Sequence, residues 1–295
     1  MKKIELIGVT VGNTPMIQLT DRLYAKLETY NPSGSIKDRL IYYLLRDAIA
    51  AKEITHETRL IEATSGNTGI SLSLFGAYLG LDTTIIMPSN MSEERKIMMK
   101  SYGANVLEVC PSDFSGAIKL RDEMCKKDNK LWSPKQFSNL KNICCHMETT
   151  AEEIYRSVGS QWSAFVSGAG TGGTMMGIQT YIKQQSLPVE TILMTPLEDS
   201  HTHGIQGVND GADFLLNKEI VSHEIKISTP EAIDRAKRLA RETGLLVGIS
   251  SGANVLAAER YIERENPSGI VVTILCDRGE RYTSIFNQYV PVQNR

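Results

Sequence analysis

Short apolar runs alternate with longer stretches of helical periodicity along most of this chain. The expected strands are residues 23–28, 60–63, 83–87, 105–109, 164–167, 191–195 and 270–276, and the expected helices are residues 36–51, 67–78, 92–102, 114–126, 147–158, 173–185, 230–242 and 254–265. Strands that are separated by helices form parallel sheets, which the helices cover on both faces. The pattern therefore predicts an α/β fold whose ligands bind at the carboxyl ends of the strands.

Composition narrows the classes of protein to which the chain can belong. Its 295 residues are 41% hydrophobic, enough to bury a core as one large domain or two modest ones. The net charge is −2 and no basic tract occurs, so we expect no nucleic-acid partner. No apolar run approaches the ~20 residues that span a bilayer, and residues 1–3 lead into no signal-peptide core, so we expect no membrane association. Five unpatterned cysteines indicate reduced thiols in a cytoplasmic protein.

Residues 31–39 read Asn-Pro-Ser-Gly-Ser-Ile-Lys-Asp-Arg and place Lys37 in the first turn of a helix. The free amides and the dipole at a helix start disfavour a cation. Lys37 therefore has a reason to lose its proton, and an uncharged amine is a nucleophile toward carbonyl groups. On this stretch alone, a solvated lysine that pairs with Asp38 is the better-supported interpretation.

Residues 168–174, Gly-Ala-Gly-Thr-Gly-Gly-Thr, follow one expected strand and open a helix. Closely spaced glycines let backbone amides approach an anion at a helix start, where the dipole stabilises it. The stretch also satisfies the G-x-G-x-x-G dinucleotide fingerprint, but the next strand ends without the acid that such a site wants ~20 residues on. The hydroxyls of Thr171 and Thr174 suit a terminal phosphate. We favour a monophosphate, with a nicotinamide- or nucleotide-binding protein as the alternative of another class.

Residues 64–69, Thr-Ser-Gly-Asn-Thr-Gly, form a second small-residue helix start. Its hydroxyls and amides suit a substrate carboxylate. The alternative is an ordinary capped helix. The adjacent Cys144, Cys145 and His146 invite a metal interpretation, but neighbouring cysteines on a helix point apart and no second ligand pair exists, so we expect no metal.

Taken together and in this order, the three stretches closely resemble the signatures of the cysteine synthase and cystathionine β-synthase family, whose cofactor is pyridoxal 5′-phosphate (PLP). The resemblance extends from residues 12–15 to residues 279–282. It implies a fold-type II, tryptophan synthase β-like homodimer with two parallel-sheet α/β domains. A smaller mobile domain, residues 31–141, would carry the lysine loop and residues 64–69. A larger domain, residues 142–295 with part of 1–30, would carry the phosphate loop.

The resemblance also implies a role for each matching residue. Lys37 would hold the cofactor as an imine and remove the α-proton of the substrate. Asn67 would contact the ring hydroxyl, and Cys276, within a Cys-Asp-Arg-Gly stretch like that of the cysteine synthase B branch, would face the ring nitrogen as a neutral partner. Phosphate would be bound by Gly170, Thr171, Gly172, Gly173 and Thr174, and the substrate by Thr64, Ser65, Gly66, Thr68, Gln136 and Asp210.

The implied reaction is the formation of L-cysteine from O-acetyl-L-serine and sulfide through an aminoacrylate intermediate. The alternative within the class is a cysteine β-lyase or cystathionine β-synthase-like enzyme that releases hydrogen sulfide from cysteine. Asp210 bears on this choice, because the acetylserine enzymes carry glycine there. A carboxylate at the mouth of the site would favour addition of water or a thiol and repel hydrosulfide. The alternative, which we slightly favour, is that Asp210 is a turn residue.

Overall fold

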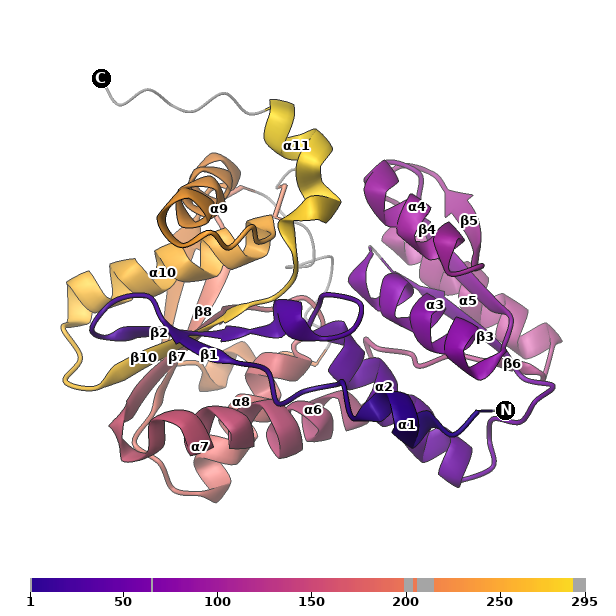
Figure 1. Cartoon of the computed structure of the whole chain (residues 1–295), viewed down its shortest axis with the longest axis horizontal. Helices are drawn as coiled ribbons and strands as arrows, with labels where there is room; N and C mark the ends of the chain where they lie inside the picture. Colours follow the sequence, from indigo (N-terminus) through magenta and orange to yellow (C-terminus); the bar gives the residue numbers. More distant parts are fainter. Residues whose placement is uncertain (1, 65, 199–203, 206–214, 289–295) are drawn as a thin grey trace.

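The computed structural model describes residues 2–64, 66–198, 204–205 and 215–288, and it contains two separate sheets, side by side in Figure 1. The larger sheet has the strand order β1-β2-β10-β7-β8-β9. All of its neighbouring strands are parallel except β1 and β2, which are antiparallel. Its strands are β1 (Met16–Gln18), β2 (Leu23–Leu27), β7 (Trp162–Gly168), β8 (Glu190–Pro196), β9 (His223–Ile227) and β10 (Ile270–Leu275).

Helices cover both faces of this larger sheet, as parallel strands require. On one face, α9 (Thr229–Thr243) and α10 (Ile249–Glu265) share a hydrophobic cluster with the strands. On the other face, α7 (Glu152–Val158) and α8 (Gly173–Gln184) complete a second cluster.

The smaller sheet has the order β5-β4-β3-β6, and all of its strands are parallel. The strands are β3 (Arg59–Ala63), β4 (Thr83–Pro88), β5 (Asn105–Val109) and β6 (Leu131–Trp132). The helices α2 (Lys37–Ala50), α3 (Asn67–Leu79) and α4 (Glu93–Ser101) contribute to one core cluster, and α5 (Phe114–Lys127) contributes to another. The predicted α/β fold with two parallel sheets is confirmed, whereas the domain boundaries 31–141 and 142–295 stay a prediction.

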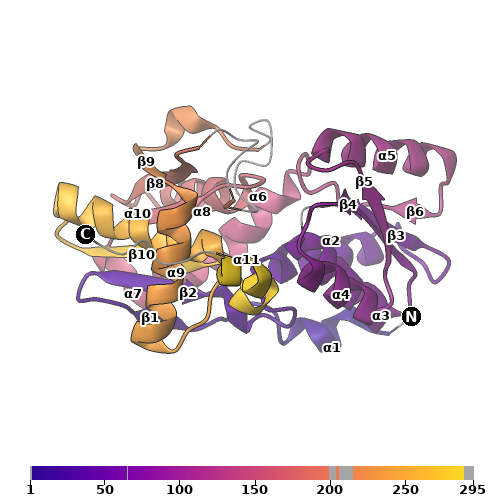
Figure 2. The ribbon, with the colours of Figure 1, turned by 90° about the horizontal axis from the view of Figure 1, so that it is seen from above.

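One long helix begins earlier than its sequence predicts. The expected helix over residues 147–158 is preceded by α6 (Lys141–Cys145) and by a wider π-helical turn (His146–Ala151), and both continue directly into α7. The side chain of Asn139 accepts a hydrogen bond from the Lys141 amide at 3.1 Å and so satisfies one free donor at the new start. In Figure 2, α6 lies between the two sheets.

The helix expected over residues 254–265 also starts early, at Ile249. Residues 249–253 are rich in serine and glycine, which have weak helix propensity, but tertiary packing overrides it. A Cβ on Gly252 would lie 2.2 Å from the carbonyl oxygen of Ala232, so the two helices α10 and α9 meet closely at this point. The short elements α1 (Ile4–Gly8), β1, β6, β9 and α11 (Thr283–Gln288) were not predicted. Within the described ranges, no helix is long and apolar enough to cross a membrane.

Candidate active site

A pocket opens between the two sheets, at the carboxyl ends of β3, β7 and β10, where the parallel strands predict ligand binding. Most of the predicted site residues line it: Lys37, Thr64, Asn67, Thr68, Gln136, Gly170, Thr171, Gly172, Thr174 and Cys276. Gly66 and Gly173 lie beside the pocket but do not line it. Ser65 and Asp210 fall outside the described residues.

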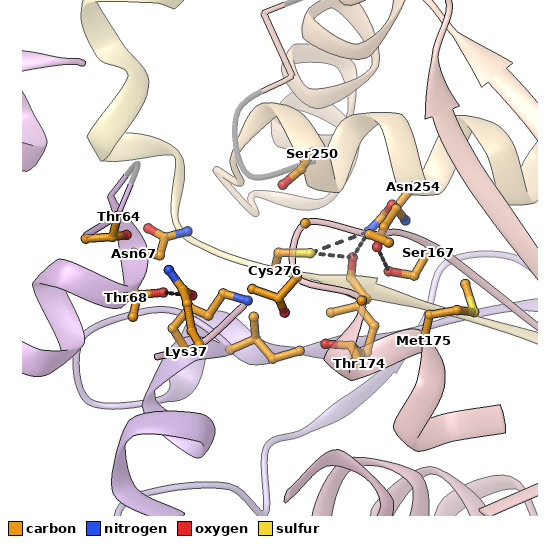
Figure 3. Close-up of a pocket in the computed structure, with 18 of the residues that line it drawn as sticks. Lys37, Thr64, Asn67, Thr68, Ser167, Thr174, Met175, Ser250, Asn254 and Cys276 are labelled. Carbon is orange, nitrogen blue, oxygen red and sulfur yellow. Dashed lines mark hydrogen bonds between the residues drawn. The ribbon is translucent and has the colours of Figure 1, made fainter. Parts of the chain in front are cut away.

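Lys37 is the first residue of α2, and its side chain points into the pocket (Figure 3). The turn before it is held to the chain that follows β10. The Ile36 amide donates to the Cys276 carbonyl at 2.9 Å, and the Arg278 amide donates to the Gly34 carbonyl at 3.2 Å. The position of the lysine is therefore set by backbone contacts with the segment that carries Cys276.

A buried ion network anchors the same end of α2. The Arg39 guanidinium bonds Glu28 on one side and Glu153 on the other, with its closest contact to each at 2.7 Å. Lys26 completes the network with an ion pair to Glu153, also at 2.7 Å. Burial alone would raise the pKa of Glu153, but hydrogen bonds and charge from Arg39 and Lys26 lower it to about 2. The network joins α2 to β2 and α7, both of which belong to the larger sheet and its helices.

The glycine loop between β7 and α8 has the predicted form. Gly172 has φ +86°, a left-handed conformation that favours glycine. A Cβ at this residue would lie 2.5 Å from the backbone nitrogen of Leu216, and the Leu215 amide donates to the Thr171 carbonyl at 3.1 Å. Gly172 is therefore required by its conformation and by the close approach of the neighbouring backbone.

Cys276 lies at the end of β10 and is held as a neutral thiol. Burial raises its pKa to about 12, and the charge of Asp277 adds to the effect. Asn254 reaches it from α10: the Asn254 carboxamide donates to the Ile274 carbonyl at 3.0 Å and to the Cys276 sulfur at 3.5 Å, and accepts from the Gly168 amide at 2.8 Å. A neutral partner of this kind suits an unprotonated pyridine nitrogen.

The segment predicted to bind the substrate carboxylate connects to residues on both sides of the pocket. The Thr68 hydroxyl donates to Gln136 Oε1 at 2.6 Å. Asn67 donates from Nδ2 to Asp277 at 2.7 Å and accepts at Oδ1 from Arg281 at 2.6 Å, so its carboxamide bridges to the chain after β10.

Among the described residues, four polar side chains that line the pocket were not predicted to do so: Arg95, Ser167, Ser250 and Asn254. Arg95 extends from α4, donates to the Tyr282 hydroxyl at 2.6 Å and lies over the Tyr282 ring. A Cβ on Gly66 would lie 2.6 Å from Nε of Arg95, so this glycine makes room for the arginine. The Gly-Ile-Ser-Ser-Gly stretch at residues 248–252, a third small-residue helix start, is the sequence signal that could have indicated Ser250.

His146 is fully buried in the π-helical turn, next to the start of α8. Its Nδ1 lies 2.9 Å from Thr150 Oγ1, and its Nε2 lies 3.3 Å from Thr174 Oγ1. Burial, followed by the positive charges of Lys37 and Arg39, lowers its pKa to about 3. The imidazole therefore stays neutral next to Thr174.

This neutral histidine predicts a pH dependence of stability. Between pH 6.5 and about 3, the unfolded chain binds a proton at His146 that the folded chain does not, so stability is lost as the pH falls. We expect the free energy of unfolding of the apo protein to fall by about 1.4 kcal/mol per pH unit below 6.5 on this account. Urea denaturation at pH 6.5 and 5 compares the parent with His146→Gln, which lacks this contribution. Equal losses in the two proteins would contradict the assignment.

Residues 7–277 match the model of the pyridoxal-phosphate dependent enzyme family. The chain belongs to this family. Cysteine synthase B of Campylobacter jejuni is 40% identical over 299 residues, covering 96% of this chain and 98% of that protein. Cysteine synthase B of Escherichia coli is 37% identical, covering 93% of each. The nicotinamide- or nucleotide-binding alternative is therefore wrong.

Solved structures agree with this membership. A hydrogen sulfide-producing enzyme of Fusobacterium nucleatum superposes with a TM-score of 0.90 at 34% identity, covering 99% of this chain and 93% of that one. An O-acetylserine dependent cystathionine β-synthase from Helicobacter pylori has a TM-score of 0.86 at 33% identity, covering 96% and 98%. The protein is a fold-type II enzyme that depends on PLP. The site fits this cofactor, because a lysine faces a glycine-lined helix start and a neutral thiol across one pocket.

Proposed function

We propose that this enzyme forms L-cysteine from O-acetyl-L-serine and sulfide and releases acetate. The observation that carries the proposal is the position of Lys37 between two helix starts that suit anions (Figure 3). One, at the beginning of α8, suits a phosphate, and the other, at the beginning of α3, suits a substrate carboxylate. An amino acid bound between them would present its α-carbon to the lysine.

In this proposal Lys37 holds the cofactor through Nζ and, once the substrate is bound, removes the α-proton. When bound, PLP supplies the electron sink that makes this proton acidic. Cys276 would face the ring nitrogen as a neutral partner that does not protonate it, and Asn67 would contact the ring hydroxyl. The phosphate is held by Gly170, Thr171, Gly172, Gly173 and Thr174.

The substrate carboxylate is assigned to Thr64, Ser65, Gly66, Thr68 and Gln136. Because Gln136 Oε1 already accepts from the Thr68 hydroxyl, its Nε2 hydrogens are directed elsewhere and suit a carboxylate. A hydrogen bond holds the backbone of Gln136 in place, since its amide donates to the buried Glu62 carboxylate at 3.3 Å. Glu62 in turn pairs with Arg121 at 2.7 Å. Arg95 adds a positive charge to the same wall of the pocket.

A second candidate function is the release of hydrogen sulfide from cysteine. The structural likeness to a hydrogen sulfide-producing enzyme favours it, and an aspartate-to-asparagine variant of such an enzyme has been solved with an α-aminoacrylate intermediate. This chain has an aspartate, Asp210, in a segment that otherwise resembles the acetylserine enzymes, which carry glycine at that position. We also propose that the enzyme is a cytoplasmic homodimer and that its partners are its small-molecule substrates. Size-exclusion chromatography with light scattering would test whether it is a dimer.

Comparison of Asp210→Asn with the parent tests the choice between the two functions. Cysteine formation from O-acetylserine and sulfide is measured alongside sulfide release from cysteine. If Asp210 accepts a proton from water or a thiol, the ratio of sulfide release to synthesis should fall about a hundredfold or more in the variant, within the range for general base catalysis. Synthesis that dominates in both proteins, with an unchanged ratio, makes Asp210 a turn residue and the enzyme a cysteine synthase. Synthesis that is undetectable in the parent would overturn the proposed function.

A further inference from the structure

Asn142 connects the two anion-binding segments of the pocket, although it does not line the pocket itself. It lies in α6, between the two sheets in Figure 2, and is fully buried. Its Nδ2 donates to the Gln136 carbonyl at 3.0 Å and to Thr171 Oγ1 at 3.0 Å. A carboxamide nitrogen carries two hydrogens, so each contact uses one of them.

These contacts determine the direction in which Thr171 donates its hydroxyl proton. Thr171 Oγ1 accepts from Asn142 Nδ2 and also from the Gly173 amide, at 3.3 Å. A hydroxyl has two acceptor lone pairs and one proton. Because both lone pairs are occupied, the proton is free to point into the pocket, which Thr171 lines. The hydroxyl is thereby set as a donor, which is the role an anionic phosphate needs.

We propose that Asn142 is a positioning residue that presents the Thr171 hydroxyl to the cofactor phosphate and fixes the backbone of Gln136 for the substrate carboxylate. One carboxamide would thus set both anion subsites. The inference rests on the proposed placement of the phosphate at residues 170–174 and extends it to a residue outside the pocket.

The fit around the side chain explains why the adjacent glycine is needed. Asn142 Oδ1 would lie 2.0 Å from a Cβ on Gly173, so only glycine leaves room for the carboxamide. Oδ1 itself is buried without a hydrogen-bond partner among the described residues. A buried oxygen without a partner carries a desolvation cost. We infer that the two hydrogen bonds of Nδ2 outweigh this cost and are the reason for an asparagine at this position. Aspartate in its place would accept from Thr171 and turn the hydroxyl proton away from the phosphate.

The test compares apo forms of the parent, Asn142→Leu, Asn142→Asp, Thr171→Val and the Leu/Val double variant. Each is titrated with PLP and, separately, with pyridoxal, which lacks the phosphate. We expect Asn142→Leu and Thr171→Val each to weaken PLP binding about tenfold to a hundredfold, the worth of a hydrogen bond to a charged group, and to leave pyridoxal binding unchanged. The dissociation constant of the double variant for PLP should be no higher than that of the single variant with the higher constant. Both changes remove the same hydrogen bond from Thr171 to the phosphate, so their effects should not add. Asn142→Asp should bind PLP more weakly than Asn142→Leu.

A separate measurement addresses the carboxylate half of the proposal. Asn142→Leu saturated with PLP should show a raised KM for O-acetylserine, whereas Thr171→Val should not, because of these two residues it is Asn142 that donates to the Gln136 carbonyl. An unchanged KM in Asn142→Leu would overturn this half.

The possible failures are distinguishable. If Thr171→Val binds PLP as the parent does, the phosphate does not lie at this loop, and the proposed placement fails together with the inference. If Thr171→Val weakens PLP binding but Asn142→Leu does not, or if their effects add fully, the placement stands and the inference is wrong. Equal weakening of PLP and pyridoxal by Asn142→Leu would show only a general disturbance of the fold and would also overturn it.

Discussion

Lys37→Ala is expected to fold and to lose at least roughly a thousandfold in cysteine formation, within the range for a lost acid–base group. Alanine is the best helix former, so the first turn of α2 should persist. The variant should also lack the covalent attachment point for PLP. Absorbance of the loaded protein and intact-mass analysis after borohydride reduction measure this directly.

A matched control is Lys141→Ala, which removes a half-exposed lysine that pairs with Asp47 on the surface. It should retain both the adduct and the activity, because exposed ion pairs contribute little. A borohydride-reduced adduct on a different lysine of Lys37→Ala would show that the assignment of Lys37 is wrong.

Gly172→Ala is expected to weaken both the fold and cofactor binding. If a side chain here blocked the approach of the phosphate and did nothing else, PLP affinity would fall far more than apo stability. The structure adds a cost to the fold itself, because φ is +86° and a Cβ would lie 2.5 Å from the Leu216 nitrogen. The left-handed conformation alone should cost the apo protein about 1–3 kcal/mol of unfolding free energy.

Gly170→Ala provides the comparison for Gly172. Gly170 lines the same pocket but is not among the glycines with positive φ, so its replacement should affect PLP binding more than stability. Urea denaturation of both apo variants and titration with PLP separate the two effects. An apo Gly172→Ala as stable as the parent would contradict the structural explanation.

The parts of the site that could be predicted from sequence are those in which neighbouring residues act together. Lys37 and residues 64–69 and 168–174 each lie at the start of a helix, so the local sequence determines both the backbone and the exposed amides. The parallel pairing of the strands was predictable for the same reason, since each strand and helix has its own periodicity, whereas the division into two sheets came from the resemblance to the family.

Side chains that reach the pocket from elsewhere could not be predicted in this way. Arg95 reaches the pocket from the first turn of α4, and Asn254 from the second turn of a helix whose first residues have weak propensity. Asn142 acts through a hydroxyl on another helix start. Their roles depend on tertiary packing between α4, α6, α10 and the strands, which no local pattern encodes.

The buried ion network has a further consequence for how the site can move. Although α2 packs into the core of the smaller sheet, Arg39 fastens its first turn to Glu28 and Glu153, which belong to the larger sheet and its helices. These ion pairs tie Lys37 to the larger sheet, whose helix α8 carries Thr174, whereas Thr68 belongs to α3 beside the smaller sheet. If the smaller sheet rotated against the larger one, the ion pairs would hold the first turn of α2 with the larger sheet, so Thr68 would move relative to Lys37 while Lys37 kept its place beside the glycine loop.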